Sequence, residues 1–254
     1  MKINNIYFSP TGGTKKVSDL ISKELGGDIS ETDLSICNMD YSKCVFGADE
    51  ICVIAVPSYG GRVPAIALER LSKTKPQGCK TVLIVAFGNR DYDDTLLELK
   101  EEAVKYGFNP VAAIAAVTEH SIMHEFAAKR PDESDIKCLR EYAEKIKNIS
   151  FNNNDILDIK VKGNKPYKEY NGVPLKPSAS KSCTACGLCA KSCTVGAIST
   201  QNPTITDTEK CISCMRCISI CPKHARKLNA VILFAATQKL KKACSERKKN
   251  ELLL

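Results

Sequence analysis

The sequence lacks any long uninterrupted apolar run. The longest candidate, Val231–Ala236, is far shorter than the roughly eighteen residues that a membrane-spanning helix needs. The N-terminal stretch Met1–Phe8 contains one lysine and no apolar segment of the length found in secretion signals. We therefore expect a cytoplasmic protein with no membrane span.

Two common nucleotide-binding motifs are also missing. In the first glycine-containing loop, Ser9–Thr14, no Gly-Lys-Ser/Thr occurs, and Lys15 and Lys16 come one position too late for a Walker loop. The Gly-x-Gly-x-x-Gly pattern of dinucleotide-binding domains is absent there too. The sequence therefore gives no indication of a nicotinamide site.

Cysteine, by contrast, is abundant, with 14 residues in the chain. Disulfides are rare in a reducing cytosol, so cysteines grouped there at regular spacing more often bind metal or take part in redox chemistry. Eight of them lie between Cys183 and Cys221 in two copies of one pattern. The other six are scattered, and we interpret them as ordinary thiols: Cys37, Cys44, Cys52, Cys79, Cys138 and Cys244.

The eight grouped cysteines have the spacing of iron–sulfur ligands. Three cysteines at i, i+3 and i+6 reach three irons of one cube, and the fourth cysteine of each copy ligates the other cube. A pair of zinc sites is the alternative, but zinc usually takes two well-separated pairs of ligands and fits this spacing less well. We therefore predict two [4Fe–4S] clusters, one held by Cys183, Cys186, Cys189 and Cys221 and the other by Cys193, Cys211, Cys214 and Cys217.

Residues 181–227 resemble the bacterial two-cluster ferredoxins, which are small α+β domains. Besides the ligands, the resemblance includes Gly187, Gly196–Ala197 and the closing Cys221-Pro222. The chain departs from the family pattern at Thr194, where the family usually has proline after the cysteine. We expect this departure to affect the local turn and the potential of one cluster. Arg216 and Lys223 are expected to be solvated surface residues.

Residues 1–150 alternate between short apolar runs and helical patterns. The expected strands are Lys2–Phe8, Asp28–Leu34, Ile51–Val56, Thr81–Phe87 and Val111–Val117. The expected helices are Thr14–Leu25, Pro64–Ser72, Thr95–Tyr106 and Asp132–Asn148. Because strands and helices alternate and several strands are apolar almost throughout, the pattern predicts a doubly wound α/β domain with five parallel strands. The stretch Ser35–Asp49 is too irregular to assign.

The loop Ser9-Pro10-Thr11-Gly12-Gly13-Thr14 joins the first expected strand to the first expected helix. Backbone N–H groups at a helix start bind anions, and glycines let the backbone approach the ligand closely. The loop resembles the phosphate loop of flavodoxins, Ser/Thr-x-Thr-Gly-x-Thr, at every defined position. The resemblance implies an FMN site whose phosphate is held by this loop.

Two further loops, Val56–Pro64 and Gly88–Asp93, follow expected strands at the carboxyl edge of the sheet, where ligands bind in open α/β folds. Flavodoxins hold the isoalloxazine ring with the corresponding loops. The resemblance implies that Tyr59 or Tyr92 stacks on the ring, with simple packing or exposure as the alternative for each, and that Gly60 or Gly61 turns a carbonyl toward N5. The implied FMN-binding residues are Ser9, Thr11, Gly12, Gly13, Thr14, Ser58, Tyr59, Gly60, Gly61, Gly88, Asn89 and Tyr92.

Charge is unevenly distributed along the chain. Residues 1–150 hold 19 Lys and Arg against 22 Asp and Glu, whereas residues 151–254 hold 18 against 7. A basic half is typical of nucleic-acid binding. However, two oxidised clusters contribute about −4 and a flavin phosphate about −2, so the loaded protein would be close to neutral. We therefore expect no nucleic-acid partner.

The chain divides into four expected parts: a flavodoxin-like FMN-binding domain (1–150), a linker that packs in part against a domain (151–180), a two-cluster domain (181–227) and a basic helical tail (228–254). We expect the apolar residues of the tail to cover the cluster domain, with a docking or membrane-surface role as the alternative. Taken whole, the chain resembles the flavodoxin–ferredoxin fusion proteins of anaerobes.

That resemblance implies an electron carrier in anaerobic metabolism, with other redox proteins as partners. A flavin-dependent reductase fed by the clusters is the second hypothesis, with His120, His124 and Arg90 as its candidate substrate contacts, although we favour both histidines as solvated loop residues. A third hypothesis makes the N-terminal domain a docking module without a cofactor. The sequence does not decide whether the protein is an enzyme, nor its oligomeric state.

Overall fold

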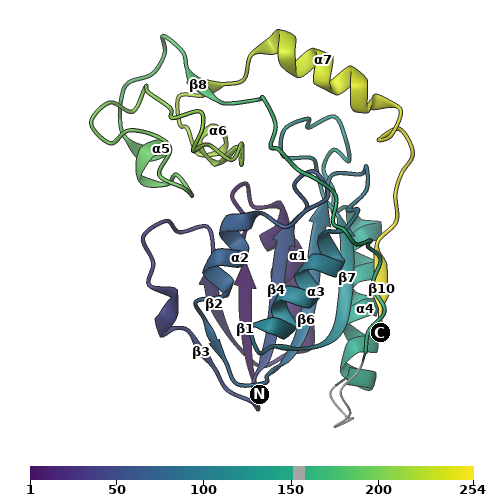
Figure 1. Ribbon diagram of the computed structural model, residues 1–254. Coiled ribbons are helices and arrows are strands. Elements are labelled where there is room, and N and C mark those ends of the chain that lie inside the picture. The colour runs from purple at the N-terminus through teal and green to yellow at the C-terminus, as the bar shows by residue number, and fades with distance from the viewer. Residues whose placement is uncertain (151–157) are drawn as a thin grey trace.

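The computed structural model describes residues 1–150 and 158–254, and its centre is a six-stranded sheet of strand order β10-β7-β6-β4-β1-β2 (Figure 1). Five strands run parallel: β1 (Lys2–Tyr7), β2 (Asp28–Asp33), β4 (Ile51–Pro57), β6 (Lys80–Phe87) and β7 (Asn109–Val117). Counted along the chain, these five strands have the order 2-1-3-4-5, which is the flavodoxin-like order. The predicted doubly wound α/β fold is confirmed.

Helices cover both faces of the sheet, which is why the central strands are apolar on both sides. On one face, α1 (Gly13–Leu25) and α4 (Glu133–Ser150) pack against the core through residues such as Val17, Ile21 and Leu139. On the other face, α2 (Ala65–Leu71) and α3 (Thr95–Lys105) bury Leu71 and Leu99. The four predicted helices are present, with ends that differ by one or two residues from the prediction.

The prediction of five strands is incomplete, because the C-terminal residues form a sixth. Strand β10 (Glu251–Leu253) pairs antiparallel with β7, next to α4 (Figure 1). Leu252 packs into the core on the α1–α4 face and Leu253 into the core on the α2–α3 face. A strand of three residues carries no periodicity of its own, so its position depends on the partner strand.

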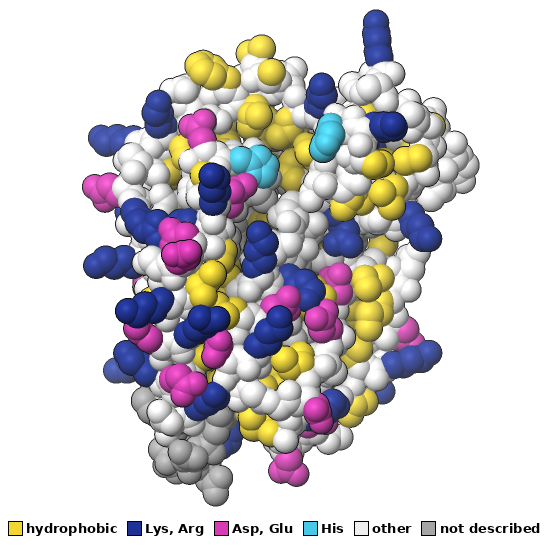
Figure 2. All heavy atoms as spheres, turned by 180° about the vertical axis from the view of Figure 1, so that it is seen from behind, with side chains coloured by type: hydrophobic (Ala, Val, Ile, Leu, Met, Phe, Trp, Pro, Cys, Tyr) yellow, Lys and Arg dark blue, Asp and Glu magenta, His cyan; other side chains and the backbone are white. Residues whose placement is uncertain are grey.

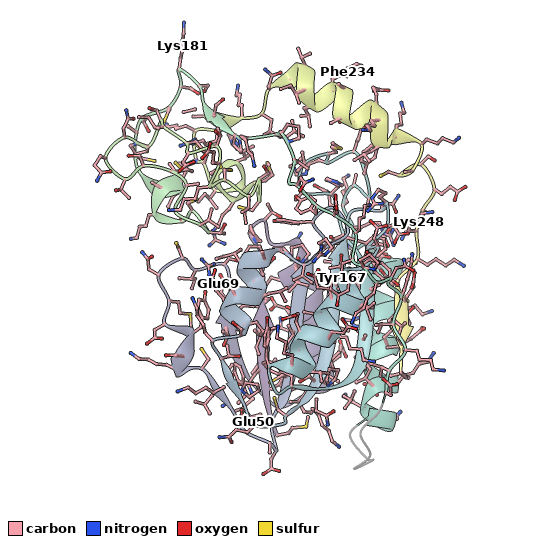
Figure 3. The ribbon with its side chains drawn as sticks, in the orientation of Figure 1. Glu50, Glu69, Tyr167, Lys181, Phe234 and Lys248 are labelled. Atoms are coloured by element: carbon pink, nitrogen blue, oxygen red, sulfur yellow. The ribbon has the colours of Figure 1, made fainter. Side chains whose placement is uncertain are left out.

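The predicted helical tail is correct for α7 (Ala230–Lys241) and wrong for the residues of β10. Asn229 begins α7, its side chain accepting hydrogen bonds from the backbone N–H groups of Val231 and Ile232. Leu233 and Leu240 pack against Met123, Phe126 and Leu175, whereas Val231 and Phe234 are exposed. Figure 3 shows Phe234 on α7 at the top of the molecule. The helix therefore covers the 118–131 loop and the connector rather than the cluster domain.

The connector is ordered where the structure describes it, and its first seven positions, 151–157, lie outside the described residues. Beyond them, Ile159 is buried in the core beside α3. The carboxylate of Asp94 accepts hydrogen bonds from the backbone N–H groups of Asn164 and Lys168. The connector thus follows α3 to the carboxyl edge of the sheet before it enters the cluster domain.

The cluster domain lies above α2 in Figure 1. Its ends are joined by a short antiparallel pair, β8 (Ser178–Ala179) with β9 (Arg226–Lys227), and it contains the single-turn helices α5 (Leu188–Lys191) and α6 (Arg216–Ser219). The unassigned stretch 35–49 contains the 3-10 helix η1 (Tyr41–Lys43) and β3 (Val45–Phe46), which pairs with β5 (Lys75–Pro76). In the described part of the chain, no helix is long and apolar enough to cross a membrane.

Candidate functional site

The eight grouped cysteines line two small cavities, four to each. We call the set Cys183, Cys186, Cys189 and Cys221 the outer set, and the set Cys193, Cys211, Cys214 and Cys217 the inner set. Each set takes three cysteines from one sequence copy and the fourth from the other. These are the two sets that the spacing predicts, and the assignment of one cluster to each stays a prediction.

The two sequence copies also share their backbone geometry. Gly187 and Met215, each directly after a cysteine, have left-handed φ angles of 77° and 62° and begin α5 and α6. In each copy a backbone N–H donates to the fourth cysteine: Ala197 to Cys193 Sγ at 3.2 Å and Ala225 to Cys221 Sγ at 3.3 Å. Such N–H···S bonds stabilise a thiolate and help to set the potential of an iron–sulfur cluster.

The surroundings of two arginine side chains indicate whether the cavities suit an anionic cluster. Arg216 lines the inner cavity and Arg226 the outer one, and the buried Nε of each has no hydrogen-bond partner among the described residues. Buried cationic groups are costly without a compensating negative charge. A [4Fe–4S] cluster with four thiolates carries about −2, so it would supply that charge in each cavity. Arg216 is therefore not the solvated surface residue expected from the sequence.

A much larger cavity of about 640 Å³ opens at the carboxyl edge of the sheet. The loops after β1, β4 and β6 line one side, as predicted, and the connector and α7 line the other. Predicted FMN-binding residues that line it are Ser9, Thr11, Gly13, Thr14, Ser58, Tyr59, Gly60, Gly61 and Gly88. Its volume lies within the usual range of pockets for small ligands, about 300–1,000 Å³.

One end of the cavity is the N-terminus of α1. Gly12 precedes the helix in a left-handed conformation (φ 91°) and, as the N-cap residue, has no side chain to bond the first N–H groups of the helix. The hydroxyl of Ser9 accepts a hydrogen bond from the backbone N–H of Lys15 at 2.9 Å, which fixes the loop. Uncapped N–H groups at a helix start, together with Thr11 and Thr14, form a cradle that fits a phosphate group.

Two tyrosines from different segments meet in the lining of the cavity. Tyr59 follows β4, and the ring of Tyr170 from the connector lies directly against Gly60, where an added Cβ would come within 2.3 Å of it. Burial raises the pKa of Tyr59 well above its ordinary value, and the neighbouring Cys214 and Tyr170 raise it further. Tyr59 thus lies between the cavity and the inner cysteine set.

Three predicted FMN-binding residues lie outside the cavity lining. Gly12 lies in the phosphate-type loop directly between the lining residues Thr11 and Gly13, but it is not itself part of the lining. Tyr92 is buried against Phe87, and its hydroxyl donates to Glu251 of β10. The Asn89 amide donates to the carbonyl oxygens of Cys244 and Glu246. The structure therefore contradicts the stacking role for Tyr92, because the C-terminal segment engages it.

The two loop histidines differ in their surroundings. His120 lines the cavity, and its Nδ1 accepts hydrogen bonds from the backbone N–H groups of Ile122 and Met123. Burial, aided by His124 and Arg90, lowers the pKa of His120 to about 4, so the imidazole is neutral at pH 7. His124 is exposed and pairs with Glu119 at 2.7 Å. The expectation of solvated histidines is correct for His124 and wrong for His120.

Sequence reasoning missed the residues that close the cavity. They come from the connector, the 118–131 loop, the inner cysteine loop and α7: Tyr170, Val173, Met123, Ser213, Ala236, Lys239 and Leu240. Only the length of the connector and the apolar residues of α7 hinted at such packing. Figure 2 shows acidic and basic side chains interspersed on this face, with apolar side chains both at the top and in the lower half.

Comparison with known proteins gives two matches to 4Fe–4S binding domains, over residues 180–196 and 204–227. Among solved structures, the chain is similar to a flavodoxin of Streptococcus pneumonia TIGR4, at 19% identity and a TM-score of 0.40, over 57% of this chain and 97% of that one. It is also similar to a flavodoxin from the domain Archaea (15%, 0.42, 58% and 97%) and an azoreductase from Bacillus anthracis str. Sterne (13%, 0.40, 58% and 99%). A comparison with curated proteins gives no match.

The chain therefore combines a flavodoxin-like α/β domain, defined by its strand order, with a ferredoxin-type domain that binds [4Fe–4S] clusters. It fits a flavodoxin–ferredoxin fusion. This combination of domains implies electron transfer.

Proposed function

We propose that the protein is an electron carrier that exchanges electrons between two [4Fe–4S] clusters and an FMN bound in the 640 Å³ cavity. The observation that carries the proposal is the position of Ser213. It lies in the inner cysteine loop between the predicted ligands Cys211 and Cys214, and it lines the same cavity as the phosphate-type loop residues Thr11 and Thr14. The inner cysteine loop would then border both the inner [4Fe–4S] cluster and the FMN.

The cavity residues support FMN as the flavin. The uncapped start of α1 suits its phosphate, while Tyr59, Tyr170 and the apolar Met123 offer faces for a flat ring. The charged side chains of the lining are balanced, with Arg90, Lys168 and Lys239 against Asp91, Glu119 and Glu169, so the preference for a phosphate depends on the start of α1. Bound FMN would supply one- and two-electron chemistry, and these residues would bind it, orient it and exclude water.

A flavin-dependent reductase fed by the clusters is the second candidate, because His120 lines the cavity in its neutral form. Since Nδ1 accepts two hydrogen bonds, the proton is on Nε2, which could donate to a substrate. Steady-state assays with candidate acceptors would separate an enzyme from a carrier.

Flavin binding tests the proposal most simply. The anaerobically purified protein should bind FMN far more tightly than riboflavin, because riboflavin has no phosphate for the α1 cradle. Gly12→Glu should abolish FMN binding through charge repulsion. Gly78→Glu is the matched control: Gly78 has a similar left-handed φ (77° against 91°) and equally open surroundings, but it lies away from the cavity. Equal affinity for riboflavin and FMN, measured by fluorescence titration, would refute the phosphate site.

A further inference from the structure

The inner cysteine set faces the α/β domain, whereas the outer set faces away from it. Next to the inner ligands, Ile212 packs against the core of the sheet and Ser213 lines the large cavity. Among the described residues, those that line the outer cavity all belong to the cluster domain, and its ligand Cys186 is exposed. A cluster held by the inner set would therefore be the one beside the cavity.

Thr194 gives the inner set a hydrogen bond that the outer set lacks. Its side chain is fully buried, and its hydroxyl lies 3.4 Å from the Sγ of Cys214. A cysteine bound to iron is a thiolate without a proton, so the hydroxyl must be the donor. The corresponding position in the second sequence copy is Pro222, which has no side-chain donor. The departure from the ferredoxin pattern thus has a physical consequence for one cluster.

Arg70 adds a buried positive charge beside Thr194 and the inner cysteine set. It belongs to α2 of the α/β domain, where Figure 3 labels its neighbour Glu69, and only 4% of Arg70 is exposed. Its guanidinium donates to the carbonyl oxygens of Leu34 at 2.7 Å and of Thr194 at 2.6 Å. Carbonyls carry no net charge, and burying a cation is costly unless negative charge lies close. A cluster on the adjacent Cys193 would provide it.

We propose that Thr194 and Arg70 are positioning residues that set the inner cluster at a higher reduction potential than the outer cluster. Reduction adds one negative charge to a cluster, and both a donated hydrogen bond and a nearby cation stabilise that charge. One electron taken from an external one-electron reductant therefore comes to rest on the cluster beside the cavity. The proposal rests on the clusters of the proposed function and does not require the flavin.

The test is a dithionite titration of the reconstituted two-cluster protein, followed by EPR spectroscopy. Thr194→Val keeps the shape and removes the hydroxyl, and it should shift one of the two midpoint potentials to a more negative value. We expect about a tenfold change in the distribution of the electron between the clusters, which is ~59 mV for a one-electron couple. The shifted signal should be the one that is reduced first in the native protein.

Three further variants separate potential tuning from a structural effect. Thr194→Ser keeps the hydroxyl and should keep the native midpoint. Arg70→Gln keeps a donor for the Thr194 carbonyl but loses the charge, and it should shift the same signal in the same direction. Thr200→Val is the matched control, because the exposed Thr200 hydroxyl bonds to the side chain of Gln201 rather than to a ligand sulfur; it should shift neither midpoint.

Unchanged midpoints in Thr194→Val, or a shift of the signal that is reduced last, would overturn the proposal. Addition of FMN to flavin-free protein tests independently which cluster lies beside the cavity. It should change the midpoint or line shape of the signal that Thr194→Val shifts, and leave the other signal unchanged. A change of only the other signal would contradict the assignment. If FMN does not bind at all, the proposed flavin function fails, while the Thr194→Val shift still tests the present inference.

Discussion

At the scale of single residues, His120 connects the cavity to the stability of the loop around it. Its Nδ1 accepts two backbone hydrogen bonds at the start of the segment that packs under α7. Its ring also lies against Gly88, where an added Cβ would come within 2.5 Å of it. Burial, aided by the nearby His124 and Arg90, holds the pKa of His120 at about 4, and protonation of Nδ1 would also break both hydrogen bonds.

This depressed pKa predicts a loss of stability in mild acid. Between an ordinary histidine pKa of about 6.5 and the folded value of about 4, the unfolded chain binds a proton that the folded chain does not. Stability should therefore fall by about 1–3 kcal/mol as the pH decreases through this window, and be unaffected above it.

The variant His120→Asn, whose carbonyl can accept the same hydrogen bonds, should remove this part of the pH dependence in urea unfolding. His124→Asn should keep most of it, because burial is the largest cause of the His120 shift and the exposed His124 contributes less. Identical pH profiles for the native protein and His120→Asn would show that His120 is not the responsible group.

A second residue-scale prediction concerns Cys193, which belongs to the inner set although it follows the outer ligands in sequence. Cys193→Ser should lower the iron content by about four atoms and expose the inner thiols, since one cluster holds four irons. Alkylation under anaerobic conditions, followed by mass spectrometry, should label Cys211 and Cys214 while Cys183 and Cys186 stay protected. Labelling of Cys183 and Cys186 instead would disprove the crossed ligation.

The sequence could predict the parts of the site whose residues follow a strict spacing along the chain. The cysteines and the loop Ser9–Thr14 each carry their chemistry within a few adjacent positions. Tyr170 could not be assigned in this way, and Asn89 was assigned to the flavin although it bonds to the C-terminal segment, because the contacts of both depend on segments more than 80 residues apart in the chain. Tyr92 was misassigned for the same reason, since its partner Glu251 belongs to a strand with no sequence signal.

At the scale of elements, the C-terminal strand is held by one buried asparagine. Asn250 accepts a hydrogen bond from the backbone N–H of Val117 at 2.8 Å, and its amide donates to Asp135 at 3.1 Å. Asp135 also pairs with Arg130, which donates to the carbonyl oxygen of Lys248. The end of β7, the start of α4 and the tail therefore share one polar network.

Asn250→Ala should destabilise the protein by about 1–3 kcal/mol, because it leaves a buried N–H and a buried carboxylate oxygen short of a partner. The midpoint of urea unfolding, followed by circular dichroism, measures the loss. Lys249→Ala, at the exposed neighbouring position, is the control and should stay near the native value. If both variants unfold at the same urea concentration, the network does not anchor β10.

The periodicity of apolar residues in the sequence predicted the long helices and strands but not the short ones. The strands β4, β6 and β7 are apolar almost throughout because helices cover both faces. By contrast, β10 and the pairs β3–β5 and β8–β9 have two or three residues each, too few for a period to show. The direction of α7 depends on the apolar loop residues Met123 and Phe126 rather than on its own pattern.

At the scale of the whole molecule, two covalent connections join the cluster domain to the sheet. The connector reaches it along α3, and the tail returns from it through α7 to β10 (Figure 1). Arg70 of α2 bonds to Thr194, and Lys176 of the connector bonds to the carbonyl oxygen of Cys211. These contacts restrict the position of the clusters relative to the cavity more than a flexible linker would.

The restricted arrangement makes transfer between the clusters and the flavin an intramolecular event. Its rate should then be set by the fixed geometry and not by encounters between molecules. The contacts that set this geometry are buried or partly buried, so salt should have little effect on the rate.

The most direct test of the account is flash photoreduction of the fully loaded protein over a hundredfold range of concentration. After the clusters are reduced, the absorbance of FMN should decay with a first-order rate constant that is the same at every protein concentration and at low and high salt. A rate constant that rises in proportion to protein concentration would show that electrons pass between molecules, and it would contradict the claim that this chain joins clusters and flavin into one unit.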